Sequence, residues 1–232
     1  MALLGATLGP AGQAAQDLTA ERFRQQRQAM VRDQIAGQGI RDTGTLRAMG
    51  AVPRESFVPA SLRNRAYGDH PLPIGLGQTI SQPYIVAYMT EVIGPRRGMR
   101  VLEVGTGSGY QAAVLAEVGC EVYTVEIFPA LADSAARRLT RLGYHAVHAR
   151  QGDGHFGWPE AAPFDAIVVT AAAGYVPPDL IAQLKPGGRM VIPVGSVYGV
   201  QNLILVEKAA SGAVSSRTLL PVRFVPLLGG PR

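Results

Sequence analysis

The residues best suited to chemistry lie in a glycine-rich segment near the middle of the chain. In Val101–Tyr110, which reads VLEVGTGSGY, an apolar stretch runs directly into three alternating glycines. Glycines let the backbone turn sharply and let a ligand approach it closely. Glu103 stands two residues before the first of these glycines. Its carboxylate would repel a pyrophosphate, whereas it would attract a ligand that carries an ammonium group.

Two further carboxylates follow the next two apolar stretches. Glu126 comes 21 residues after Gly105, and Asp153 stands between two glycines. Nucleotide ligands of open α/β sheets bind at the carboxyl ends of the strands. There Glu126 could bind both ribose hydroxyls, and Asp153 could receive an adenine amino group. An ordinary turn is the alternative for the glycine segment taken alone.

The sequence therefore predicts a site for S-adenosyl-L-methionine, with S-adenosyl-L-homocysteine as the product. The GxGxG spacing and Glu103 disfavour a nicotinamide dinucleotide, whose loop reads GxGxxG. Ile127 is expected to pack against the adenine face, and Tyr110 over the methionine end. The residues predicted to bind the cofactor are Glu103, Gly105, Thr106, Gly107, Ser108, Gly109, Glu126, Ile127, Asp153 and Gly154.

Alternating strands and helices must position these residues. The apolar pattern predicts strands at Val101–Val104, Glu121–Val125, Ala146–Arg150, Ala166–Thr170, Arg189–Val194, Leu203–Glu207 and Leu219–Phe224. Helices are predicted at Tyr110–Val118, Pro129–Leu142 and Asp179–Leu184. Such alternation is typical of a mostly parallel sheet with helices on both faces. We expect an α/β, Rossmann-like methyltransferase core over residues 100–232.

The N-terminal part shows a different pattern. Residues 1–16 are small, apolar and uncharged, and we expect them to form a flexible tail. Residues 17–99 are expected to form a helical segment that packs on the substrate side of the core, within one structural domain. Helices are predicted from Asp17 to about Gln38, from Asp42 to Gly50 and from Pro83 to Gly94, with irregular chain over Val52–Gly77.

The composition excludes several classes of protein. The chain has 232 residues, of which 47% are hydrophobic and 17% are charged, so it can build a core and is not a disordered chain. No run approaches the ~18 apolar residues of a membrane span. One cysteine and four scattered histidines argue against a disulfide and a metal site. The net charge of +5 comes from dispersed arginines, so we expect no nucleic-acid partner.

Together with segments elsewhere in the chain, these residues resemble the protein-L-isoaspartate O-methyltransferases. The similarity runs from about Met30 to Leu228. Beside Val101–Tyr110 it rests on AVPRESFVP at 51–59, PLPIG at 71–75, GQTISQP at 77–83, GDG at 152–154, APFDAIVVTAA at 162–172, QLKPGGR at 183–189, PVG at 193–195 and VRFVP at 222–226. Many methyltransferases share the glycine segment, whereas GQTISQP combined with PVG is specific to this family.

The resemblance implies an enzyme that moves a methyl group from S-adenosyl-L-methionine to the free carboxylate of L-isoaspartyl residues. Its substrates would be damaged proteins and peptides, and the methyl ester would start their repair to aspartate. By the same resemblance Ser81 is the active-site residue, and Gln201 matches a glutamine that contacts the cofactor. The residues then expected to bind the substrate are Thr79, Ile80, Ser81, Val194 and Gly195.

The expected role of Ser81 follows from the acceptor. A carboxylate is already ionised at pH 7, so it needs no general base. Holding it in line with the sulfonium then supplies most of the rate. A serine hydroxyl can donate one hydrogen bond that orients the carboxylate. We therefore expect Ser81 to position the substrate rather than to act as a nucleophile, with capping of the helix that starts near Pro83 as the structural alternative.

Other functions stay open from the sequence alone. One is a related carboxyl methyltransferase that acts on aspartyl groups of a specific peptide, and another is a cofactor-binding module without activity. Intact Glu103, Ser81 and Asp153 argue against the module. We expect a monomer in the cytoplasm, with no membrane partner. Ala11–Ala15 loosely resembles a cleavage region, so a truncated export signal is the alternative for residues 1–16, which lack a basic region.

Overall fold

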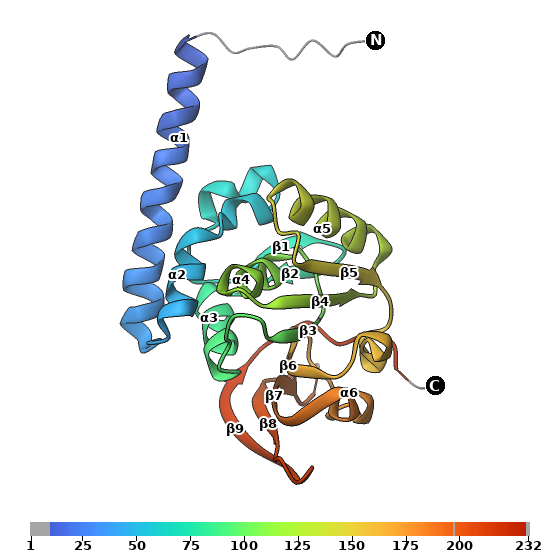
Figure 1. Ribbon diagram of the computed structural model, residues 1–232. Helices are drawn as coiled ribbons and strands as arrows, with labels where there is room; N and C mark the ends of the chain where they lie inside the picture. The colour runs from blue at the N-terminus through green and yellow to red at the C-terminus, as the bar shows by residue number, and fades with distance from the viewer. Residues whose placement is uncertain (1–9, 197, 231–232) are drawn as a thin grey trace.

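A mixed sheet of seven strands forms the centre of the molecule (Figure 1) in residues 10–196 and 198–230, which the computed structural model describes. In spatial order the strands are β5 (Val147–Gln151), β4 (Glu121–Glu126), β3 (Arg100–Val104), β6 (Phe164–Val169), β7 (Leu184–Val194), β8 (Gln201–Lys208) and β9 (Val214–Val222). The α/β fold expected for this part of the chain is confirmed.

The first five strands in this order are parallel, so their carboxyl ends meet at one edge of the sheet. Val101 in β3 pairs with Val122 in β4 and with Ala166 in β6. β8 is antiparallel to both β7 and β9. Glu103 and Glu126 stand near the ends of β3 and β4, and the parallel register therefore brings them to the same edge.

Helices cover both faces of the sheet, which explains the apolar, β-branched character of its central strands. On one face, Met89 of α3 (Pro83–Val92) and Leu115 of α4 (Tyr110–Val118) pack against the sheet. On the other face, Leu180 of α6 (Pro178–Gln183) and Ala161 of the 3-10 helix η6 (Pro159–Ala161) do so. The helix α5 (Pro129–Arg141) packs along β4 and β5.

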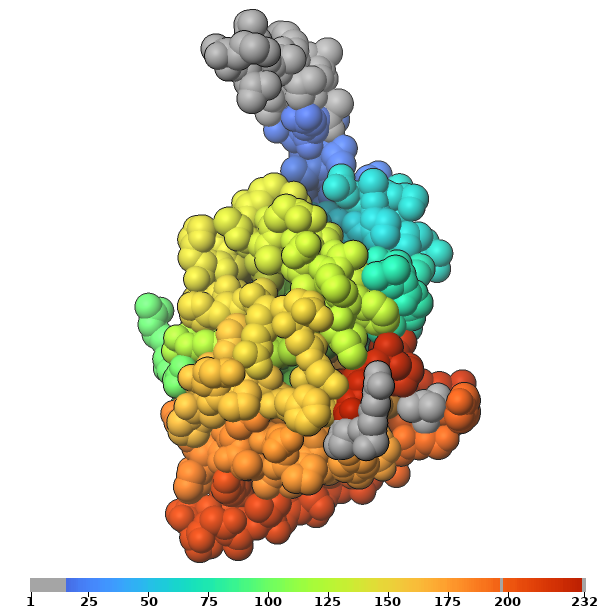
Figure 2. Space-filling view, turned by 90° about the vertical axis from the view of Figure 1, so that its right-hand side faces the viewer, coloured from blue at the N-terminus to red at the C-terminus, as the bar shows by residue number. Residues whose placement is uncertain are grey.

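The N-terminal segment begins with a long helix that projects from the body (Figures 1 and 2). α1 (Pro10–Ala29) continues through a π-helical turn, η1 (Met30–Ile35), and a 3-10 turn, η2 (Ala36–Gln38). Residues 10–16, expected in the flexible tail, are thus helical, and residues 1–9 lie outside the described part of the chain. The helix begins earlier than predicted. Pro10 can start it because proline is tolerated in a first turn, where its missing N–H group costs no hydrogen bond.

Short helices join α1 to the core. They are α2 (Thr43–Ala51), η3 (Arg54–Phe57) and η4 (Ala60–Arg65). The helix predicted from Asp42 to Gly50 corresponds to the first of these, and Asp42 is its N-cap, since Asp42 Oδ1 accepts a hydrogen bond from the Thr45 N–H group over 2.6 Å. Within residues 10–196 and 198–230, each helix is too short or too polar to span a membrane.

A hairpin replaces part of the expected irregular chain. β1 (Leu72–Gly75) and β2 (Gln78–Ile80) are antiparallel and joined by a tight turn at Leu76 and Gly77. The prediction of irregular structure up to Gly77 was wrong over β1. The two prolines that flank Leu72 had indicated a break in secondary structure, but an edge strand tolerates proline. The hairpin delivers Gln78–Ser81 to the carboxyl edge of the sheet.

The chain after β9 returns across the same edge. The Ala172 N–H group donates to Val225 O, and the Leu227 N–H group donates to Ala172 O, each over 2.8 Å. Farther on, Gly230 N–H donates to Asp153 Oδ2 over 2.7 Å. We call Val225–Gly230 the C-terminal strap. In Figure 2 its red surface lies beside the cyan segment that carries β1 and β2.

Candidate active site

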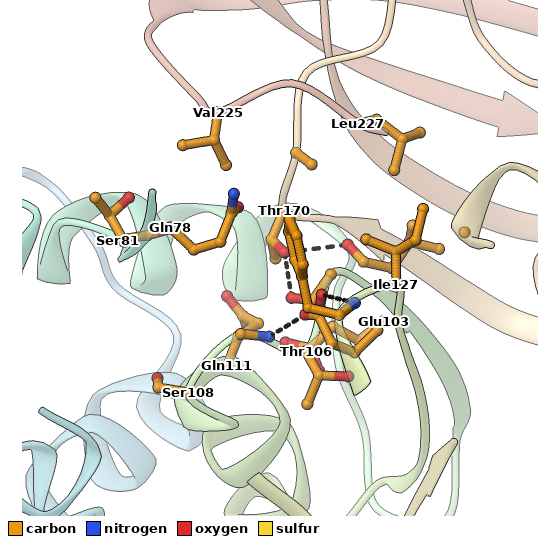
Figure 3. A pocket seen from close by; sticks show the side chains of 18 of the residues that line it. Gln78, Ser81, Glu103, Thr106, Ser108, Gln111, Ile127, Thr170, Val225 and Leu227 are labelled. Atoms are coloured by element: carbon orange, nitrogen blue, oxygen red, sulfur yellow. Dashed lines mark hydrogen bonds between the residues drawn. The ribbon is translucent and has the colours of Figure 1, made fainter. Parts of the chain in front are cut away.

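Two adjoining cavities open at the carboxyl edge of the parallel strands. The first encloses about 720 Å³ of empty space between the glycine segment, β2 and the C-terminal strap (Figure 3). The second encloses about 960 Å³ between Pro71, Ile85 and residues 221–225. Both cavities are lined by Thr79, Ser81, Thr170 and Val225. The two cavities therefore meet at the predicted active-site serine.

Most of the predicted residues gather around the first cavity. Its wall includes Thr79, Ile80, Ser81, Glu103, Gly105, Thr106, Gly107, Ser108, Tyr110, Glu126, Ile127 and Gly154. Gly109 does not line it. This residue is the N-cap of α4, and its Cα faces Leu139. The glycine segment and the carboxylates expected at the cofactor therefore share one cavity wall.

Glu103 is the most deeply buried carboxylate of the cavity wall. Its side chain is 0% exposed, and Oε2 accepts a hydrogen bond from Thr124 Oγ1 over 2.5 Å. Oε1 has no hydrogen bond of normal geometry, although the nearby Ala112 N–H group favours the charged form. Burial raises the pKa of Glu103 to about 8, and the charge of Glu126 acts in the same direction. A buried oxygen without a partner is suited to a ligand that donates an N–H group.

Glu126 holds the glycine segment and the start of α5 together. Its Oε2 accepts from the Gly107 N–H group over 2.7 Å, and its Oε1 accepts from the Phe128 N–H group over 3.0 Å. A carboxylate has about four acceptor positions, so two remain for a ligand. Ile127 and Phe128 continue the same wall with apolar surface, as expected for a face that packs against a planar base.

Thr170 is a site residue that the sequence reasoning took only for the end of a strand. It follows β6, and its hydroxyl lies 3.0 Å from Val104 O and 2.6 Å from Gly105 O, between two carbonyls that accept from it. Gly105 has a φ of 98°, and a Cβ atom there would lie 2.5 Å from Thr170 Oγ1. Only glycine at position 105 therefore leaves room for the Thr170 hydroxyl, which lines both cavities.

Ser81 is held by its backbone, and its side chain faces the cavities. The Arg54 guanidinium donates to Ser81 O over 2.7 Å. The structural alternative for its hydroxyl is wrong, because the N-cap of α3 is Gln82 and the cap's role falls to Asp69, which accepts from the Tyr84 N–H group over 3.2 Å. No hydrogen bond links the Ser81 hydroxyl to another residue in the part of the chain that the structure describes, so it can serve a substrate.

Besides Gly109, four predicted residues do not line either of the two cavities. Asp153 has its carboxylate engaged by Gly230 and His155, with Oδ1 2.9 Å from the His155 N–H nitrogen. Partial burial raises its pKa, but these N–H groups outweigh that effect and the pKa is lowered overall. The expected contact with an adenine amino group therefore requires an acceptor position that the strap leaves free.

Gln201, which was expected at the cofactor, is buried and forms hydrogen bonds with the backbone. Its Nε2 donates to Ser196 O over 3.0 Å, and its Oε1 accepts from the Phe224 N–H group over 2.9 Å. Val194 and Gly195, expected at the substrate, lie beside the loop after β6, where Gly195 N–H donates to Ala173 O over 3.0 Å. These three assignments stay predictions, and in the structure the backbone and amide groups concerned bind the chain itself.

Other residues of the first cavity were not anticipated. Gln78 lines it beside Ser81, and Gln111 lines it on the first turn of α4. The C-terminal strap contributes Val225–Leu228, although its sequence served only as a family landmark. Among the described residues, no three His, Cys, Asp or Glu side chains are grouped to hold a metal ion.

The sheet order, the glycine segment and the carboxylates at the strand ends define the class of S-adenosylmethionine-dependent methyltransferases. A family model described as protein-L-isoaspartate(D-aspartate) O-methyltransferase matches residues 25–231. The chain therefore belongs to the protein-L-isoaspartate(D-aspartate) O-methyltransferase family.

Individual relatives agree with this membership. The chain is 57% identical over 215 residues to protein-L-isoaspartate O-methyltransferase 1 of Nitrosospira multiformis, covering 92% of this chain and 91% of that protein. It is 59% identical over 201 residues to the protein-L-isoaspartate O-methyltransferase of Opitutus terrae, covering 87% of this chain and 86% of that protein.

Solved structures agree as well. A protein-L-isoaspartate O-methyltransferase matches with a TM-score of 0.78 at 33% identity, covering 89% of this chain and 66% of that protein. A Plasmodium falciparum structure, described as a complex of such an enzyme with S-adenosyl-L-homocysteine, matches with a TM-score of 0.76 at 24% identity. It covers 87% of this chain and 98% of that protein, and it supports the fold.

Proposed function

We propose that the chain transfers the methyl group of S-adenosyl-L-methionine to the free carboxylate of L-isoaspartyl residues in damaged proteins and peptides. The observation that carries the proposal is the meeting of two cavities at Ser81. One cavity has the glycine segment and carboxylates suited to the cofactor, and the other opens beside it for a peptide. Methyl esterification of such a residue starts its repair to aspartate.

The residues of the first cavity fit the cofactor chemically. Glu103 Oε1 is buried without a partner of normal geometry and can accept from the ammonium group. Glu126 keeps acceptor positions for the ribose hydroxyls, and Ile127 supplies an apolar wall for the base. When bound, the cofactor supplies a methyl group on a positively charged sulfur.

The residues around Ser81 perform the positioning. The Ser81 hydroxyl donates a hydrogen bond to one oxygen of the acceptor carboxylate and leaves the other oxygen for the attack. The acceptor is already ionised at neutral pH, so no residue has to remove a proton. Thr79 and Thr170 line both cavities, where the cofactor and the peptide would meet. Orientation of the carboxylate there supplies most of the rate.

A methylation assay with paired substrates tests the function. The purified chain receives tritiated S-adenosyl-L-methionine and either an isoaspartyl peptide or its aspartyl twin. We expect base-labile methyl esters on the isoaspartyl peptide and only background on the twin. Equal labelling of both peptides would instead support the related carboxyl methyltransferase, and labelling of neither would contradict the proposal.

We also propose that the protein acts as a monomer in the cytoplasm and has no nucleic-acid partner. The dispersed arginines and the direct access from solvent to the second cavity support this proposal. Light scattering, fractionation of cells that express the native gene, and filter binding with nucleic acid test its three parts. Recovery of the protein in the periplasm would favour the export signal instead.

A further inference from the structure

Gln111 presents a fixed acceptor to the first cavity. Its side chain lines the cavity and is 6% exposed. Its Nε2 donates to Thr90 Oγ1 over 2.9 Å, and that hydroxyl donates its only proton to Val86 O over 2.7 Å. Because Thr90 can then only accept, the amide nitrogen must face Thr90, and the amide oxygen is the atom left for the cavity.

This oxygen has no partner within the described chain. Gln111 Oε1 is buried and makes no hydrogen bond, and the same is true of Glu103 Oε1 at normal geometry. Both side chains belong to the wall of the same cavity, and Figure 3 shows them on the side opposite Val225 and Leu227. Buried polar atoms in native proteins are nearly always paired, so two unpaired acceptors on one wall indicate a ligand.

The chemistry of the pair selects the ligand group. When an ammonium group binds, Glu103 gives up its proton, and the two acceptor oxygens, one of them then from a carboxylate, match a cation that carries several N–H donors. The amide nitrogen of Gln111 is committed to Thr90, so this side chain offers no donor to a carboxylate or phosphate. In a small ligand that binds at a glycine segment, an ammonium group meets these requirements.

We propose that Gln111 Oε1 and Glu103 Oε1 together bind the α-ammonium group of the cofactor, and that Gln111 is a specificity-determining residue for its amino-acid end. The inference rests on the proposed function, since it assumes that S-adenosyl-L-methionine occupies this cavity. It adds a consequence: the site distinguishes the intact cofactor from nucleosides that have the same adenosyl group but no ammonium group.

Binding calorimetry with three probes tests the proposal. S-adenosyl-L-homocysteine carries both the ammonium and the carboxylate, decarboxylated S-adenosylmethionine keeps only the ammonium, and 5′-methylthioadenosine has neither. In Gln111→Met we expect the first two to bind about tenfold or more weakly, as for the loss of one hydrogen bond to a charged group, and 5′-methylthioadenosine to bind within about twofold of the wild type.

Two further variants keep the test sharp. Gln78→Met removes an amide from another wall of the same cavity and should leave the ratio of the affinities for S-adenosyl-L-homocysteine and 5′-methylthioadenosine unchanged. Gln111→Glu loses the donor to Thr90 but keeps an acceptor oxygen and adds a negative charge, so it should keep or raise the wild-type ratio, even if Gln111→Met does not fold. Equal weakening of both probes by loss of the Gln111 amide, no weakening of either, or a ratio that falls in Gln111→Glu would each overturn the proposal. A wild-type chain that does not bind S-adenosyl-L-homocysteine would contradict the proposed function instead.

Discussion

The buried guanidinium of Arg54 donates a hydrogen bond to the backbone carbonyl oxygen of Ser81 over 2.7 Å. A second bond, from its Nε to Ala66 O, is also 2.7 Å long, and the guanidinium lies 4.8 Å from the centre of the Tyr110 ring. Arg54 is 0% exposed, and this burial lowers its pKa. The cation thus ties η4, Ser81 and the first turn of α4 together from inside the protein.

We expect Arg54→Lys to impair turnover more than cofactor binding. An ammonium cannot reproduce the planar fork that reaches two carbonyls, so Ser81 loses its fixed position. Displacement of a positioning residue can lower kcat by about 10- to 100-fold. Steady-state kinetics and S-adenosyl-L-homocysteine binding measure the two effects, and Arg24→Lys, at an exposed arginine of α1, is the matched control. A loss of affinity as large as the loss of kcat would contradict this role.

Ser81→Ala should slow methyl transfer by a limited factor, ~10- to 1,000-fold, because one orienting hydrogen bond is lost. Binding of S-adenosyl-L-homocysteine should change little. The wild-type rate should fall at low pH only as the substrate carboxylate takes up its proton. A methylated serine found by mass spectrometry, or complete loss of turnover, would identify a nucleophile instead.

Glu126→Gln should weaken S-adenosyl-L-homocysteine binding about 10- to 150-fold, which corresponds to ~1.5–3 kcal/mol for hydrogen bonds to a charged acceptor. The amide keeps the size of the side chain, but it has one acceptor oxygen, so the bond from either the Gly107 or the Phe128 N–H group is lost as well. Calorimetry measures the affinity, and circular dichroism checks the fold. Unchanged affinity would remove Glu126 from the cofactor site.

The free energy of unfolding should depend on pH through Glu103. Its pKa is about 8 in the folded protein and near 4.5 otherwise, so between these values the folded state holds a proton that the unfolded state has lost. Stability should therefore fall as the pH rises from about 4.5 to about 8. Glu103→Gln should remove this slope, and its advantage over the wild type should grow by up to ~1.4 kcal/mol per pH unit. Urea denaturation of both proteins across this range measures it, and parallel curves would refute the expectation.

Much of the core could be predicted because its signals are local. Glu103 and Glu126 follow apolar stretches, and a parallel sheet brings the ends of such strands to one edge. Ser81 lay in a motif of the family. The hairpin of β1 and β2 was missed because Pro71 and Pro73 resemble a break, and the early start of α1 because short apolar sequence resembles a tail.

The hydrogen bonds that Asp153 and Gln201 make within the chain could not be predicted from the sequence. Asp153 and Gln201 have the residue types expected of ligand-binding groups, and nothing near them in the sequence shows that residues 224 and 230 satisfy them. The path of the chain after β9 is decided by tertiary contacts rather than by a local pattern. The proposed role of Gln111 could not be predicted for a related reason, since it depends on which of the two amide atoms contacts Thr90.

The C-terminal strap also has a consequence for biosynthesis. Val225–Leu228 complete a cavity whose other walls come from earlier parts of the chain, between residues 78 and 171. During synthesis the N-terminal part of the chain leaves the ribosome first. The parallel strands of the sheet can therefore form while the strap is still inside the exit tunnel. Such a nascent chain has the glycine segment and the carboxylates of the first cavity but lacks the wall that Val225–Leu228 form. We therefore expect the nascent chain to bind the cofactor fully only after the strap has left the exit tunnel.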